Sequence, residues 1–146
     1  MAVCRDDDHR NVTALMMATI KGNCDVLSLL LSHKADVNAC DSDMYTALHF
    51  AAYYDKADCG SLLLSHGAHV DARIQCTGPT ALILAAEDGN CDFLSSLLLH
   101  KADINASDND KYVGLTALHF AARTGKIDAV SMLLLQTPVT TAAIHH

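Results

Sequence analysis

The sequence predicts an all-α solenoid, a stack of four similar units that each consist of a helical hairpin and a projecting turn. The heptapeptide TALHFAA at residues 46–52 returns unchanged at residues 116–122. Related segments begin at Thr13 and Thr80, so the four threonines follow one another at intervals of 33, 34 and 36 residues. Such a period is typical of repeat proteins, whose units bury their apolar faces only by stacking.

The four units account for nearly the whole chain. We expect a single domain over residues 1–146, with units at about 8–40, 41–73, 74–107 and 108–142. Because 51% of the residues are hydrophobic, the chain has enough apolar side chains for a core that runs through such a stack.

The first helix of each unit is expected to begin just after its threonine, whose hydroxyl can accept a hydrogen bond from the first turn. Alanine pairs such as residues 51–52 and 121–122 allow neighbouring helices to approach closely. Nine residues after the threonine stands a glycine in three units, at Gly22, Gly89 and Gly125. The first helix should end there.

A second helix should follow in each unit. An aspartate stands in its expected first turn, where negative charge complements the helix dipole: Asp25, Asp58, Asp92 and Asp128. A mostly apolar triplet then buries the helix, at residues 29–31, 62–64, 96–98 and 132–134. The segments KADVNA (34–39), GAHVDA (67–72) and KADINA (101–106) follow, and we expect an extended conformation there.

This pattern resembles the ankyrin repeat over roughly residues 8–142. The family's helix start Thr-Pro-Leu-His-x-Ala-Ala, its glycine, its Leu-Leu pair and its Gly-Ala-Asp-Val-Asn exit all have counterparts here. The resemblance implies an all-α ankyrin-repeat solenoid of L-shaped units. Each unit would contain two antiparallel helices, and β-hairpin loops would project at right angles and border a concave surface.

The chain departs from the family pattern in three ways. Alanine replaces the proline after the threonine in every unit, at Ala14, Ala47, Ala81 and Ala117. The exit glycine survives only as Gly67, and Lys34 and Lys101 take its place elsewhere. A left-handed conformation at these lysines would cost about 1 kcal/mol each. The last unit ends in TPVTTAAIHH, without the exit signature.

Composition excludes several classes of protein. The net charge is −7, from 17 acidic and 10 basic residues without a dense basic run, which disfavours nucleic acid as a partner. No apolar stretch approaches the ~20 residues that a membrane span needs, so direct membrane insertion is not expected. The expected compartment is the cytoplasm, with the nucleus as the alternative. The six cysteines are interpreted as reduced, mostly buried hydrophobic residues. Cys24 and Cys91, two units apart, lie too far from each other to bond.

No enzyme signature is present. The sequence contains no HExxH motif, no Cys/His cluster with zinc spacing and no nucleophile motif, so we expect no catalytic residue, no metal and no cofactor. For His49 and His119, the resemblance implies hydrogen bonds within the turn that join adjacent repeats. His33, His66 and His100 recur where the second helix ends, a position that favours positive charge. The terminal pair at 145–146 is interpreted as the remainder of an affinity tag.

The candidate partner-binding residues lie at the ends of the first helices, except Tyr45 and Tyr112, which belong to the expected hairpins of the second and fourth units. Tyrosine combines a large apolar surface with a polar tip and is favoured in interfaces. The candidates are Ile20, Tyr45, Tyr53, Tyr54, Glu87, Asp88, Tyr112 and Arg123. This surface changes from apolar and aromatic in the first two units to charged in the last two. The resemblance also makes Asn38 and Asn105 candidates for asparaginyl hydroxylation, although hydrogen bonding that stabilises the fold is the simpler interpretation.

Three functions remain open. The first is a non-enzymatic module that binds another protein through the concave face and the hairpin tips. The second is a scaffold or spacer within a longer ankyrin array, such as a signalling scaffold, a channel or a microbial effector. Apolar side chains in the end units favour this second reading or self-association. The third is a regulator or inhibitor of an enzyme such as a kinase.

Overall fold

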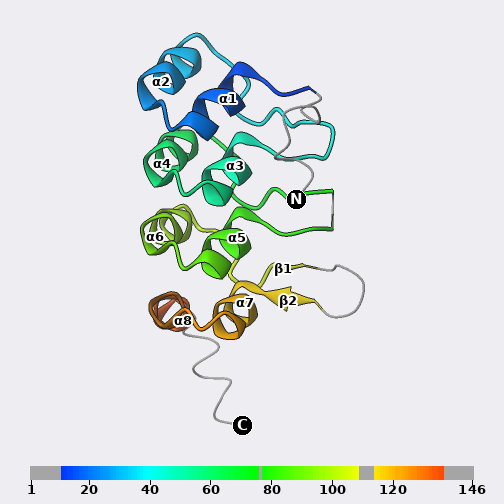
Figure 1. Ribbon diagram of the computed structural model, residues 1–146, viewed down its shortest axis with the longest axis vertical. Coiled ribbons are helices and arrows are strands. Elements are labelled where there is room, and N and C mark those ends of the chain that lie inside the picture. Colours follow the sequence, from blue (N-terminus) through cyan, green and yellow to red (C-terminus); the bar gives the residue numbers. More distant parts are fainter. Residues whose placement is uncertain (1–10, 76, 109–113, 137–146) are drawn as a thin grey trace.

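The computed structural model describes residues 11–75, 77–108 and 114–136, which form four stacked helix pairs (Figure 1). The first helices of the pairs lie in one column and the second helices in another. The prediction of an all-α solenoid is confirmed. The pairs are α1 (Ala14–Lys21) with α2 (Cys24–Ser32), α3 (Ala47–Tyr53) with α4 (Ala57–Ser65), α5 (Ala81–Asp88) with α6 (Cys91–Leu99), and α7 (Ala117–Arg123) with α8 (Ile127–Leu135).

The first helices begin directly after their threonines, as predicted, and α1 and α5 end at the predicted glycines, whereas α7 ends at Arg123 with Thr124 before Gly125. Thr13 Oγ1 accepts a hydrogen bond from the Met16 amide at 3.2 Å, and Thr80 Oγ1 accepts one from the Ile83 amide at 3.4 Å. Helices α1 and α5 end at Gly22 and Gly89, both with φ of 70°. A left-handed residue at this point satisfies carbonyls of the last turn, and glycine adopts it without steric cost.

Second helices of two kinds alternate along the stack. Asn23 caps α2 through the Val26 amide, and Asn90 caps α6 through the Phe93 amide. Lys56 and Lys126 precede α4 and α8 without a side-chain cap. The same alternation appears in the sequence, where GNCD stands at 22–25 and 89–92 and TALHFAA stands in the other two units.

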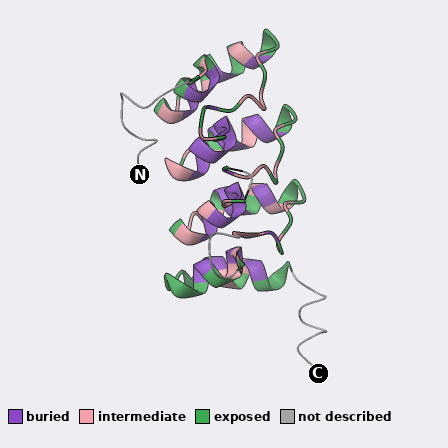
Figure 2. Cartoon of the chain, turned by 90° about the vertical axis from the view of Figure 1, so that its right-hand side faces the viewer, coloured by how far each residue is buried: buried purple, intermediate pink, exposed green. Residues whose placement is uncertain are grey.

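The core runs along the stack between the helix columns (Figure 2). One leucine from each second helix is fully buried, namely Leu27, Leu63, Leu97 and Leu133. Gly60 of α4 faces the ring of Phe93 in α6, and a Cβ at Gly60 would lie 2.2 Å from the Phe93 Cε1 atom. Glycine is therefore required for the two helices to approach this closely. The last helix pair is more exposed than the others.

The exit segments correct one expectation. They form tight turns instead of extended chain, closed by bonds from the amides of Ala39, Ala72 and Ala106 to the carbonyls three residues earlier. Lys34 and Lys101 adopt a left-handed conformation, with φ of 65° at both. The described strands are short: β1 (Ser107–Asp108) pairs with β2 (Leu115–Thr116) in antiparallel fashion, with Ser107 opposite Thr116.

Side chains join the turns of successive units. Asn38 Oδ1 accepts a hydrogen bond from the His69 amide at 2.7 Å, and Asn38 Nδ2 donates to the Gly67 carbonyl at 3.2 Å. One unit further, Asp71 Oδ1 accepts from the Asp103 amide at 2.8 Å. A bond from a side chain at the exit of one unit to an amide of the next is thus repeated along the stack.

Candidate protein-binding surface

The ends of the first helices bring one predicted residue from each unit to the same place in its unit. These residues are Ile20, Tyr53, Glu87 and Arg123, each seven residues after its threonine. Contact between the last two units is direct, because the Arg123 guanidinium lies 3.8 Å from a Glu87 carboxylate oxygen. Thr124 Oγ1 also donates a hydrogen bond to the Glu87 carbonyl at 3.2 Å.

Aromatic side chains form a continuous cluster at α3. Tyr45 stacks on Phe50 with ring centroids 5.4 Å apart, and Phe50 stacks on Tyr54 at 6.4 Å. The Tyr53 ring meets the Tyr54 ring edge-on at 5.2 Å. Tyr53 and Tyr54 are half-buried, whereas Phe50 is fully buried. The two tyrosines are therefore held at the surface by an aromatic ring that belongs to the core.

Tyr45 corrects the list of predicted surface contacts. Its side chain is only 4% exposed and belongs to the core, because it packs against Phe50 and edge-on against the imidazole of His49 at 6.0 Å. Tyr45 therefore supports the aromatic cluster from within the fold. Tyr112 lies outside the residues that the structure describes.

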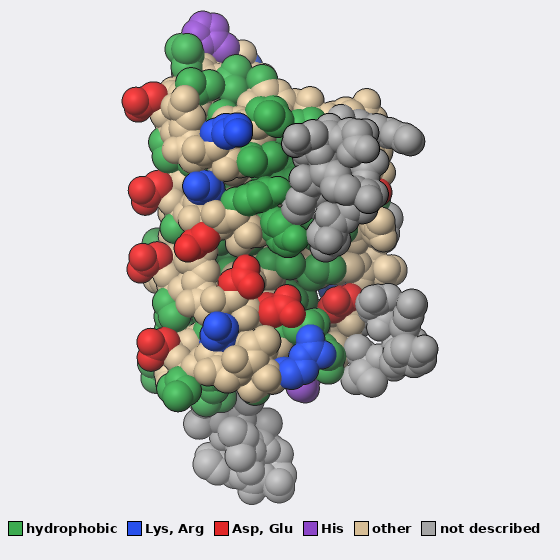
Figure 3. Space-filling view, viewed as in Figure 1, with side chains coloured by type: hydrophobic (Ala, Val, Ile, Leu, Met, Phe, Trp, Pro, Cys, Tyr) green, Lys and Arg blue, Asp and Glu red, His purple; other side chains and the backbone are tan. Residues whose placement is uncertain are grey.

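Charged side chains stand at the end of α5 and just after the end of α3. Asp88 is exposed, and burial of part of its carboxyl group and the negative charge of Asp55 raise its pKa, while the Lys126 ammonium lowers it. Figure 3 shows hydrophobic side chains running along this face and acidic side chains gathered beside them.

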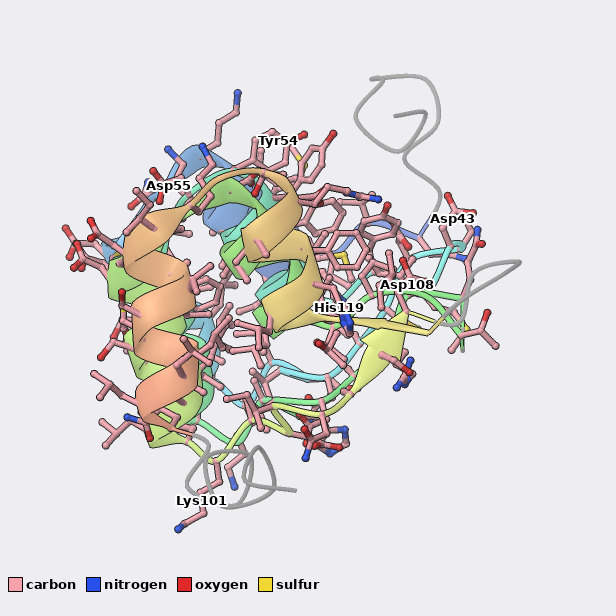
Figure 4. The ribbon with its side chains drawn as sticks, turned by 90° about the horizontal axis from the view of Figure 1, so that it is seen from below. Asp43, Tyr54, Asp55, Lys101, Asp108 and His119 are labelled. Atoms are coloured by element: carbon pink, nitrogen blue, oxygen red, sulfur yellow. The ribbon has the colours of Figure 1, made fainter. Side chains whose placement is uncertain are left out.

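A cleft of about 270 Å³ lies next to this surface, between the loops and α5. Figure 4 shows Tyr54 and Asp55 at the helix ends, and Asp43 and Asp108 on the loop side. The residues that line the cleft are Tyr45, Ile74, Gln75, Thr77, Gly78, Pro79, Leu84 and Asp108. We refer to Ile20, Tyr53, Tyr54, Asp55, Glu87, Asp88 and Arg123 as the inner-helix surface.

The His49 side chain lies inside the fold and bonds to two segments of the backbone. Its Nδ1 accepts a hydrogen bond from the Thr46 amide at 2.9 Å, which leaves Nε2 to donate to the Ala72 carbonyl at 2.8 Å. The side chain is 1% exposed. Burial lowers the pKa of His49 from 6.5 to about 4, although the bond to Ala72 acts in the opposite direction. The imidazole is thus neutral at physiological pH and ties the start of α3 to the exit of its unit.

The other histidines also contact the backbone. His119 Nδ1 accepts a hydrogen bond from the Thr116 amide at 3.0 Å, as His49 does from Thr46, but His119 is exposed. At the ends of α2, α4 and α6, a histidine Nδ1 donates to a carbonyl of the last turn: His33 to Leu29, His66 to Leu62 and His100 to Ser96. These three residues close the C-terminal ends of their helices.

The two candidate hydroxylation residues differ in environment. Both amide atoms of the half-buried Asn38 side chain are engaged by the turn of the next unit. Asn105 is exposed, and its backbone amide donates to Asp103 Oδ1 at 3.0 Å. Hydroxylation of either residue stays a prediction, with Asn105 the more accessible of the two.

Among the described residues, no group of three or more His, Cys, Asp or Glu side chains is arranged to hold a metal ion. None of the helices in residues 11–75, 77–108 and 114–136 combines the length and the apolar character needed to cross a bilayer.

Three residues with defined roles escape prediction from the sequence. Asp41 is buried, and its Oδ1 accepts from the amides of Asp43 and Tyr45, both at 2.9 Å. Arg73 donates to the carbonyls of Gly78 and Ser107 and so joins the loops of two units. Cys59 is 1% exposed and meets Cys24 of the preceding unit. Only Asp41 has a local signal, since Asp at the start of a turn often bonds to the amide two residues later.

The comparisons with known proteins agree with the fold. A family model described as "Ankyrin repeats (3 copies)" matches residues 2–74 and again residues 72–143. No curated protein matches the chain.

Proposed function

The chain belongs to the ankyrin-repeat family, and on that premise we propose that it is a non-enzymatic module whose inner-helix surface and hairpin tips hold a partner protein. Ankyrin repeats are generally protein–protein interaction modules and generally lack enzymatic activity. Function on such a fold depends on its surface residues. The more specific part of our proposal is therefore that the inner-helix surface of this chain binds the partner.

The observation that carries the proposal is the aromatic cluster at the end of α3. Tyr53 and Tyr54 present ring surface outside the core, and the buried ring of Phe50 holds Tyr54 in position. A side chain that is already ordered loses little conformational entropy on binding, which favours affinity. Asp55 directly follows Tyr54, and the Asp88 carboxyl group is affected both by the Lys126 ammonium and by the negative charge of Asp55. A partner segment with apolar side chains and a basic group fits this surface.

The test compares partner capture by three versions of the full chain. The wild-type chain, a Tyr53→Ala/Tyr54→Ala variant and a matched control are immobilised and exposed to cell extract, and bound proteins are identified by mass spectrometry. The control is Leu29→Ala/Leu99→Ala, which removes exposed apolar side chains from the second helices instead. Circular dichroism verifies that all three versions have the same helix content.

The expected result is a protein bound by the wild-type chain and the leucine control but lost with the tyrosine variant. Chemical crosslinking of the captured protein should then reach the inner-helix surface. Equal capture by all three versions would contradict the proposal for this surface.

The apolar end of the stack favours a second candidate, a scaffold or spacer that associates through its end units. Ile127 is 77% exposed and Leu134 is 43% exposed. They stand seven residues apart in α8, so they share one face of that helix. Sedimentation over a range of concentrations distinguishes this candidate, because a strictly monomeric chain would argue against it. The third candidate, inhibition of an enzyme such as a kinase, is tested by a panel of kinase assays.

A further inference from the structure

The Sγ atoms of Cys24 and Cys59 lie 3.0 Å apart, closer than two sulfur atoms in ordinary van der Waals contact. Cys24 is the first residue of α2, and Cys59 lies in the first turn of α4 in the next unit. The two residues are separated by 35 positions in the sequence, and both are free thiols. The pair therefore arises from the stacking of units and not from any local motif.

The surroundings of the pair give a reagent access to one sulfur atom and not the other. Cys59 is 1% exposed, whereas Cys24 is half-buried. Both residues line a hollow of about 360 Å³, whose charged lining residues are Lys21 and Lys56 together with Asp55, Asp58 and Asp92. A small disulfide that carries both ammonium and carboxylate groups can therefore approach the Cys24 sulfur from this hollow.

We propose that Cys24 and Cys59 are a redox modification site, at which a low-molecular-weight disulfide such as oxidised glutathione forms an intramolecular disulfide between the first two units. The proposal goes beyond partner binding and does not depend on it.

The reaction proceeds in two thiol–disulfide exchanges. The Cys24 thiol loses its proton to solvent, and its sulfur attacks one sulfur of oxidised glutathione. A mixed disulfide forms, and one glutathione thiolate leaves and takes up a proton. Cys59 then loses its proton, and its sulfur attacks the Cys24 sulfur, which releases the second glutathione. Two protein thiols are oxidised, and one glutathione disulfide is reduced to two thiols.

The second exchange is the slower one. In the reduced pair the pKa of Cys59 is raised to about 12, first by burial and then by the hydrogen bond and negative charge of Cys24. Burial continues to raise this pKa once Cys24 is in the mixed disulfide. Since only the thiolate attacks a disulfide, closure should accelerate as pH rises.

The third unit supplies a matched control. Cys91 occupies the place of Cys24 in that unit, as the first residue of α6 after a capping asparagine. The place of Cys59 in the following unit is taken by Ala129, which is fully buried. Cys91 therefore occupies the same position in the third unit as Cys24 does in the first, but the fourth unit has no cysteine at the position of Cys59.

The experiment exposes the full chain to oxidised glutathione at mildly alkaline pH under native conditions. Remaining thiols are blocked with a maleimide, and the digested protein is mapped by mass spectrometry without reduction. Wild type, Cys59→Ala and Cys91→Ala are compared, and a sample of wild type unfolded in urea is treated in parallel.

The expected main product of wild type and of Cys91→Ala is a peptide pair that links residues 24 and 59. Cys59→Ala should instead retain glutathione on Cys24. In urea the link should lose its preference over other cysteine pairs. The proposal is overturned if native wild type keeps glutathione on Cys24 as Cys59→Ala does, or if both thiols are recovered as maleimide adducts.

Discussion

His49 and His119 occupy the same position in identical heptapeptides, yet only His49 is buried. Each accepts a hydrogen bond from the amide of its own threonine at about the same distance. In addition, the Ala72 carbonyl receives the Nε2 proton of His49. Identical local sequence therefore gives two histidines with different chemical environments.

Acid should destabilise the fold through His49. Its pKa of about 4 in the folded chain lies below the ordinary value of 6.5. Between these two values the unfolded chain binds a proton that the folded chain excludes, so the free energy of unfolding falls as the pH falls. The loss from this group reaches about 2 kcal/mol at about pH 5. Urea unfolding between about pH 7 and pH 5 measures the loss, and an NMR titration of the imidazole reports its pKa directly.

Two variants separate this effect from other groups. His49→Gln should flatten the dependence of stability on pH, at the cost of lower stability near neutral pH. His119→Gln should leave the dependence as in wild type. An equal slope in all three chains would show that His49 is not the group responsible.

At the scale of elements, the interface between α4 and α6 shows how one small residue sets a helix spacing. Gly60 packs directly on the buried ring of Phe93, and the hydroxyls of Ser61 and Ser96 lie 2.9 Å apart beside it. The contact of Gly60 with Phe93 has no signal in the repeat pattern, because the other units carry Leu27, Leu94 and Val130 where the second unit has Gly60.

Gly60→Ala should destabilise the protein by about 1–3 kcal/mol, because the added methyl group must displace a ring that has no free space around it. Alanine's higher helix propensity offsets only part of this cost. Urea denaturation followed by circular dichroism measures the change. Gly60→Ala should cost less stability when it is introduced into the Phe93→Leu chain than when it is introduced into the wild-type chain, because the smaller side chain leaves room for the methyl group. If the losses of the two single variants simply add in the double variant, the steric explanation is ruled out.

A second crosslink should be obtainable by repeating the contact of Cys24 and Cys59 one interface later. Ala129→Cys would place a thiol in α8 at the position equivalent to Cys59, opposite Cys91 of α6. Under the same oxidising conditions we expect a link between residues 91 and 129 in addition to the first. Peptide mapping measures it, and a link that forms equally well in urea would mean that stacking does not bring the two thiols together.

Oxidation of the natural pair should also stabilise the stack. Its loop spans 35 residues, for which loop-closure entropy predicts a gain of up to about 4 kcal/mol. The unfolding midpoint of the oxidised chain, compared with the reduced chain, measures the gain. Cys59→Ala should show no difference between the two conditions.

At the scale of the whole molecule, the last described helix pair exposes apolar side chains. The residues from Ala122 to Asp128 are all exposed, and Ile127 and Leu134 share one face of α8. In repeat proteins the outer face of a terminal unit is usually polar. This apolar face among the described residues is the feature on which the scaffold reading and the self-association reading both rest.

Self-association through this end is expected to weaken when charge is introduced. Ile127→Glu/Leu134→Glu should shift sedimentation toward the monomer, because two carboxylates in the contact would have to lose their hydration. The control Ser95→Glu/Leu99→Glu places the same charges on exposed residues of α6, in a unit that lies at neither end of the stack. An equal effect of both pairs would point to general charge repulsion and not to this end.

The sequence alone determined the helix pairs, their caps and the period of the repeat. These features depend on contacts between residues no more than about four positions apart, such as Thr13 with Met16, and on turns that favour glycine. Such contacts form between residues that are close in the sequence, and most of them recur from unit to unit.

Only the tertiary structure decided which residues meet across units. Tyr45 joins the core instead of the surface, His49 is buried while His119 is not, and Cys24 meets Cys59 instead of its counterpart Cys91. The physical reason is that contacts between residues some 35 positions apart depend on the spacing and rotation of stacked helices. Packing across the whole interface sets that geometry, and no short stretch of sequence contains it.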